Sequence, residues 1–111
     1  MINIAVYTRS ATASPESIET QRRTINEALE QAGFMKEAAV EYYSDDGASG
    51  LNIERPGLVR LLADVAKGKF QWLVIDEWYR LSRSEDLLGI LDKLLAHNVA
   101  CVTARELEAL C

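Results

Sequence analysis

Short runs of strand-forming residues alternate with longer segments of helical periodicity along this chain of 111 residues. The predicted strands cover residues 2–7, 38–43, 70–75 and 99–103. Strands separated by helices in this way pair in parallel, because each crossover returns the chain to the same end of the sheet. We therefore expect the α/β fold class: a single domain with a mainly parallel four-stranded sheet, flanked by helices in three layers.

Helix start and stop signals lie between these runs. Pro15 is placed to open a first helix and Gly33 to end it, while Pro56 and Gly68 bracket a second. Residues 82–85 resemble a capping box before a third helix. The apolar residues of that third helix recur at helical spacing: Leu87, Leu88, Leu91, Leu94 and Leu95.

The length and composition suit one compact domain, which we expect to cover residues 1–111. Hydrophobic residues make up 49% of the chain, enough to bury a core. No apolar run is long enough to cross a bilayer and no basic region opens a secretory signal, so we expect a cytoplasmic protein with no membrane partner. Two cysteines and one histidine argue against a metal site. We expect Cys101 to be buried and His97 to lie in the last turn of a helix.

The net charge of -5 argues against a free-standing DNA-binding module, because neutralisation of phosphates supplies non-specific affinity. Contact with nucleic acid would have to be local. Ligands of such sheets meet the loops at the carboxyl ends of the strands. Six arginines are expected in or just after those loops or first helical turns: Arg9, Arg22, Arg23, Arg55, Arg80 and Arg83.

Arg80 and Arg83 are three residues apart, so on a helix they would share a face and could grip one phosphate. Asp45, Asp46, Asp76 and Glu77 follow the same strands. These charges are also compatible with ordinary solvated loops. Composition and spacing alone leave a phosphoryl-transfer enzyme and an anion-binding module as alternatives.

Five short motifs occur in a fixed order. They are Tyr-Thr-Arg-Ser-Ala-Thr at 7–12, Ser-Ile-Glu-Thr-Gln at 17–21, Asp-Gly-Ala-Ser-Gly at 46–50, Arg-Pro-Gly-Leu at 55–58 and Arg-Leu-Ser-Arg-Ser at 80–84. In order and spacing this set resembles the motifs of serine site-specific recombinases, in the N-terminal catalytic domain of the resolvase/invertase type. The resemblance extends over nearly the whole chain, from residue 4 to residue 103.

The resemblance implies DNA strand cleavage and rejoining. In that family a serine hydroxyl attacks a DNA phosphodiester, which leaves a phosphoserine link to one DNA end and a free hydroxyl on the other. The ends then exchange and rejoin without a metal or nucleotide, so no cofactor is expected. DNA is the implied partner, and the full-length protein is expected to act as a homo-oligomer, a dimer or tetramer.

The family's site residues can be placed on matching positions of this chain. An in-line displacement builds negative charge on the phosphate oxygens, and fixed guanidinium groups stabilise that charge. Arg9, Arg80 and Arg83 would grip the scissile phosphate, and Arg55 would support it. Asp46 would orient an arginine or assist proton movement, or it caps a turn. Gln21 would hold the active-site loop through its amide, or it is an exposed helix residue.

The chain departs from the family pattern at the nucleophile. Ala11 occupies the position of the attacking serine, and a methyl group cannot attack phosphorus. Ser10 is a substitute only if the loop rearranges, because neighbours on an extended segment point to opposite sides. Tyr79 also stands where the family often has an aspartate.

These departures leave two principal hypotheses. In the first, the chain is the catalytic-domain part of a recombinase, inactive as written, without the long dimerisation helix and the DNA-binding domain that relatives carry. In the second, it is a non-catalytic recombinase-like interaction module that pairs with an active recombinase. A receiver-like or flavodoxin-like signalling domain is the weakest alternative, since a receiver needs acidic residues where this first strand ends in Tyr7, Thr8 and Arg9.

Overall fold

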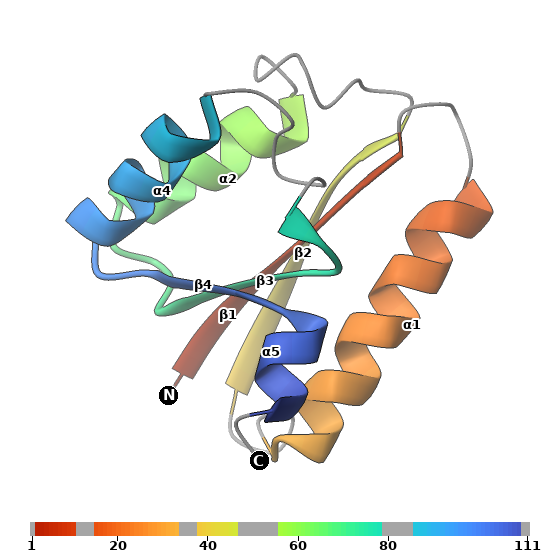
Figure 1. Ribbon diagram of the computed structural model, residues 1–111. Helices are drawn as coiled ribbons and strands as arrows, with labels where there is room; N and C mark the ends of the chain where they lie inside the picture. The colour runs from red at the N-terminus through yellow and green to blue at the C-terminus, as the bar shows by residue number, and fades with distance from the viewer. Residues whose placement is uncertain (1, 11–14, 34–37, 47–55, 79–85, 110–111) are drawn as a thin grey trace.

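A computed structural model describes residues 2–10, 15–33, 38–46, 56–78 and 86–109 of the chain (Figure 1). The strands are β1 (Ile2–Ser10), β2 (Ala38–Asp46), β3 (Trp72–Ile75) and β4 (Ala100–Thr103). The helices are α1 (Pro15–Gln31), α2 (Pro56–Ala66), α4 (Asp86–Ala96) and α5 (Ala104–Ala109). Strands and helices therefore alternate along the described chain, as the sequence predicts.

The four strands form one sheet in the order β2-β1-β3-β4, and every neighbouring pair is parallel. Tyr7 of β1 pairs with Tyr43 of β2 and with Ile75 of β3, and Ile75 pairs in turn with Thr103 of β4. The carboxyl ends of all four strands consequently lie at one edge of the sheet. The predicted four-stranded parallel sheet is confirmed.

The two faces of the sheet are covered by different helices (Figure 1). Ala5 and Tyr7 of β1 belong to a buried cluster that includes residues of α2 and α4. Ile4 and Val6 belong to a second cluster with residues of α1 and α5. Successive side chains of a strand point to opposite faces, so β1 contributes to both layers of the core. The predicted three-layer arrangement is confirmed.

The helices bury their apolar faces with one exception. The apolar residues of α2 recur at i, i+3, i+4 and i+7: Leu58, Leu61 and Val65 are buried, and Leu62 is partly buried. In α4, however, the side chains of Leu88 and Leu95 are 69% and 70% exposed. Because they are seven residues apart, Leu88 and Leu95 share one side of α4, next to the side on which Ile90 and Leu94 are buried.

The strands differ from the sequence prediction at their ends. β1 continues past Tyr7 to Ser10, and β2 continues to Asp46. The predicted loop residues Thr8 to Ser10 are strand because β1 and β2 stay paired to the Ser10–Asp46 register, and each pair satisfies backbone groups that a loop would leave to water. β3 begins at Trp72, two residues later than predicted.

The end of the described chain also differs from the prediction. Helix α5 follows β4 directly and was not predicted. Its capping box is reciprocal: Glu106 N–H donates to Thr103 Oγ1 at 3.2 Å, and Glu106 Oε1 accepts from Thr103 N–H at 3.1 Å. His97 lies in the turn after α4 instead of in its last helical turn.

Cys101 is partly buried instead of fully buried, because its strand β4 is at the edge of the sheet. Burial, with a smaller contribution from the charge of Glu106, raises the pKa of the Cys101 thiol to about 12. The thiol is therefore protonated at neutral pH. Across the described residues, no helix combines the length and apolar character that a membrane crossing requires.

Candidate functional site

Arg9 lies at the carboxyl end of β1, in the strand and not in a loop. It is 1% exposed and is the largest fully buried side chain among the described residues. Alternation along the strand places it on the same face as Tyr7, toward α2 and α4, and its register partner in β2 is Asp45. A cation buried so far is held in one position instead of sampling solvent.

Gln21 of α1 holds the backbone of Arg9 from the other side. Its Oε1 accepts from Arg9 N–H at 3.1 Å, and its Nε2 donates to the Arg9 carbonyl oxygen at 2.9 Å. The amide also donates to Ser17 Oγ at 3.2 Å. Gln21 is 2% exposed, so the alternative of an exposed helix residue is wrong. β3 pairs with β1 only as far as Tyr7, so the side-chain amide of Gln21 bonds the backbone of Arg9 where a neighbouring strand would otherwise do so. The part of Gln21 in catalysis stays a prediction.

Ser10 follows Arg9 and is also buried. Strand alternation points its side chain to the face of Ile4 and Val6, opposite to that of Arg9. Ala11 lies outside the described residues. Within β1, a hydroxyl at position 10 is therefore on the wrong face to act beside Arg9.

Asp45 is a buried carboxylate that the sequence did not single out from the loop charges. Its Oδ2 accepts from Tyr7 Oη at 2.8 Å and from Leu58 N–H at 3.0 Å, while its Oδ1 accepts from Gly57 N–H at 2.8 Å. It thus caps the first turn of α2 from a neighbouring strand. Two sequence signals could have located Asp45. It is two residues after the buried Tyr43, so strand alternation puts both side chains on one face, and the Pro-Gly pair at 56–57 marks a helix start that needs a cap.

The remaining predicted site residues are not all placed. The backbone of Asp46 pairs with Ser10 at the end of the sheet, and its side chain lies outside the described part. Arg55, Arg80 and Arg83 also lie outside the described residues. The convergence of Arg9 with Arg80 and Arg83 at this edge therefore stays a prediction.

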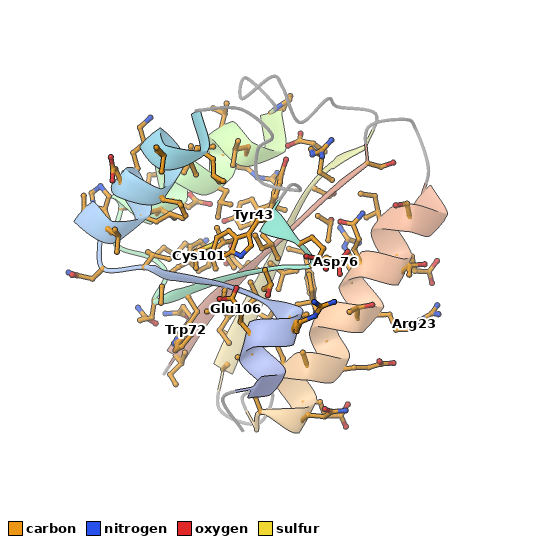
Figure 2. All side chains as sticks on the ribbon, in the orientation of Figure 1. Arg23, Tyr43, Trp72, Asp76, Cys101 and Glu106 are labelled. Atoms are coloured by element: carbon orange, nitrogen blue, oxygen red, sulfur yellow. The ribbon has the colours of Figure 1, made fainter. Side chains whose placement is uncertain are left out.

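Arg22 and Arg23, which were expected in or just after a first helical turn, lie in the middle of α1. Arg22 Nη2 is 3.4 Å from Ser44 Oγ near the carboxyl end of β2, and its guanidinium lies 5.4 Å from the centre of the Tyr42 ring. Arg23 is exposed, 4.0 Å from Glu19, and points away from the sheet (Figure 2). Of these two arginines, Arg22 is the one that lies close to the strand ends.

Acidic residues follow β3 at the same edge. Asp76 lies between the end of β3 and α1 (Figure 2). It lines a small polar pocket of about 280 Å³, together with Thr24, Glu77, Ala104 and Arg105. The edge of the sheet thus combines the buried cation of Arg9 with carboxylates on either side, in β2 and after β3.

A separate polar network lies between β2 and α2, farther from the strand end. Tyr43 Oη donates to Asp64, and Lys69 Nζ lies 2.8 Å from Glu41 Oε2. Burial, followed by the hydrogen bond and charge of Asp64, raises the pKa of Tyr43 far above its usual value. The bond from Tyr43 lowers the pKa of Asp64, and the bond to Glu41 raises the pKa of Lys69. This network joins β2 to α2.

We expect the Tyr43 network to make folding stability fall at alkaline pH. The raised pKa means that Tyr43 stays neutral in the fold, so its contribution is complete below the unfolded pKa of about 10 and is lost as the pH rises above it. Urea unfolding between pH 8 and 11 should show a decline of up to about 1.4 kcal/mol per pH unit from this group.

Tyr43→Phe should flatten that decline, whereas Tyr42→Phe, at a more exposed tyrosine, should not. The same alkaline slope in the wild-type chain and in Tyr43→Phe would contradict the assignment.

The family model and the solved structures that match this chain point to the same family. The family model described as "Resolvase, N terminal domain" matches residues 4–109. No curated protein sequence matches the chain. The N-terminal catalytic domain of TP901-1 integrase is similar in structure, with a TM-score of 0.83 and 28% identity over 94% of this chain and 79% of that chain.

Two further solved structures share the fold. The C-terminal catalytic domain of ISC1926 TnpA, an IS607-like serine recombinase, has a TM-score of 0.79 and 25% identity over 93% of this chain and 67% of that one. A resolvase family site-specific recombinase from Streptococcus pneumoniae has a TM-score of 0.76 and 22% identity, covering 96% of this chain and 74% of its own.

Proposed function

Since the chain belongs to the resolvase N-terminal domain family of serine recombinases, we propose that it is the catalytic-domain part of a serine site-specific DNA recombinase, inactive as written. The observation that carries the proposal is the position of Arg9, a buried cation at the end of β1 whose backbone N–H and carbonyl oxygen are both bonded by Gln21. Such a preorganised guanidinium can stabilise charge on a phosphate without reorganising.

The proposed chemistry divides among several residues. Arg9, Arg80 and Arg83 bind the non-bridging oxygens of a DNA phosphate, Arg55 supports them, and Asp46 orients an arginine or assists proton movement. A serine at position 11 would form the bond to phosphorus while the bond to one DNA end breaks. Ala11 supplies no oxygen for this bond, so the chain holds the phosphate but does not cut.

A non-catalytic interaction module is the second candidate. Leu88 and Leu95 of α4 are exposed apolar side chains on the surface of a chain whose net charge is -5. Exposed apolar side chains that lie together are typical of protein contacts. In this alternative the domain pairs with an active recombinase and modulates its assembly. In either case we propose that the full-length form acts as a dimer or tetramer in the cytoplasm.

Binding to duplex DNA tests the proposal. We expect a dissociation constant of about 100 µM at physiological salt, with equal affinity for duplexes of different sequence, because only local phosphate contacts contribute. Fluorescence anisotropy with labelled duplexes at two salt concentrations measures this, and affinity should rise steeply at low salt. Submicromolar, sequence-specific binding would overturn the proposal. Absence of binding even at low salt would favour the interaction module.

A further inference from the structure

Asp45 joins two segments that both lead into the proposed site. It is 6% exposed, and its two carboxylate oxygens accept three hydrogen bonds of 3.0 Å or shorter. One donor is the hydroxyl of Tyr7, which precedes Arg9 by two residues on the same face of β1. The other two are the backbone amides of Gly57 and Leu58, in the first turn of α2, which begins at Pro56.

This arrangement is too closely packed to be an incidental surface contact. A Cβ atom at Gly57 would lie 2.5 Å from the Ser44 carbonyl oxygen and 2.9 Å from Asp45 Oδ2. Only glycine lets the start of α2 approach the strand this closely. Bonds to an ionised carboxylate are about twice as strong as neutral ones, and the helix N-terminus favours negative charge.

We propose that Asp45 is a positioning residue, which fixes the Arg9 end of β1 relative to the start of α2. This inference rests on the proposed function, because it concerns how that site meets a DNA phosphate. Asp45 does not itself bind phosphate, since its carboxylate is negative and its oxygens already accept three bonds. Its effect passes through Tyr7 to Arg9 on one side and to the first turn of α2 on the other.

The charge of Asp45 and its positioning role are expected to affect DNA affinity in opposite directions, and this difference allows a test. Removing a negative charge near a phosphate site should by itself tighten binding. Loss of positioning should weaken it. In duplex titrations of the folded protein at low salt, we expect Asp45→Asn and Tyr7→Phe to bind about tenfold more weakly than the wild-type chain.

Glu41→Gln is the matched control. It removes the same charge from β2, at a residue that bonds Lys69 and lies away from the strand end. It should bind DNA as tightly as the wild-type chain or slightly more tightly. Tyr7→Phe removes one hydroxyl and keeps the ring, so it remains informative if Asp45→Asn does not fold.

Backbone ¹⁵N relaxation provides a second measurement that does not depend on DNA. Order parameters at Thr8, Arg9 and Ser10 should fall in Asp45→Asn and Tyr7→Phe and stay unchanged in Glu41→Gln. Unchanged order at these residues, or tighter DNA binding by Asp45→Asn, would overturn the positioning role. If the wild-type chain binds no duplex, the proposed function fails, and the order parameters still decide whether Asp45 fixes the strand end.

Discussion

Ala11→Ser is expected to give a covalent protein–DNA adduct where the chain as written forms none. The reason is that Ala11 has no hydroxyl, while Arg9, which we propose as a phosphate ligand, is buried in β1 with its backbone held by Gln21. The measurement uses this domain joined to a relative's long helix and DNA-binding region, with a nicked recombination site that traps the phosphoserine. Denaturing electrophoresis and mass spectrometry then detect the adduct.

Two further changes identify the groups responsible. Arg9→Ala in the Ala11→Ser background should lower adduct formation by about a hundredfold or more, because the transition state loses a principal cationic partner. Ser10→Ala in the same background should have little effect, since Ser10 points to the other face of β1.

Two outcomes would contradict this account. An adduct formed with Ala11 in place and mapped to Ser10 would show that the nucleophile position is wrong. The absence of an adduct after Ala11→Ser, in a folded protein that binds the DNA, would indicate a site degraded beyond one residue, with Tyr79 as the next position to change. The non-catalytic interaction module would then be the better function.

Gly57→Ala should destabilise the fold by about 2 kcal/mol or more. The added methyl group meets a backbone carbonyl oxygen and a buried carboxylate, neither of which can move without breaking the cap of α2. This cost exceeds the gain of about 1 kcal/mol that alanine brings to a helix interior. Urea unfolding at pH 7 measures the difference in free energy of unfolding.

Gly89→Ala is the matched control for that change. Gly89 is also helical, in α4, and its added Cβ would have nothing within 4 Å. We expect it to stabilise the fold by about 0.5 to 1 kcal/mol. Equal effects of the two substitutions would show that the contact between the start of α2 and β2 is not as close as the structure indicates.

The core of the fold could be predicted from local patterns. The apolar spacing of α2 predicted one face formed by Leu58, Leu61, Leu62 and Val65, of which Leu62 is partly buried and the other three are fully buried. The same method was less successful for α4, where Leu88 and Leu95 share the helical spacing but face solvent. Periodicity shows that a helix has an apolar face, but the width of the face that is covered depends on which elements pack against the helix.

The boundaries of the elements were less predictable for the same reason. Thr8 to Ser10 resemble a loop in composition, yet they are strand because β2 lies alongside them. The capping box of α5, formed by Thr103 and Glu106, begins at the last residue of the predicted strand 99–103, and the strand pattern there is the stronger of the two signals.

The sequence by itself determined the family motifs, the alternation of strands and helices, and the absence of a hydroxyl at position 11. These features depend on residue identity and on neighbours within a few positions. Only the tertiary structure decided that the amide of Gln21 bonds the backbone N–H and carbonyl oxygen of Arg9, and that Asp45 joins Tyr7 to α2. Those partners are 12 to 38 residues apart, and they meet because burial in a packed core requires each polar group to find an acceptor or donor there.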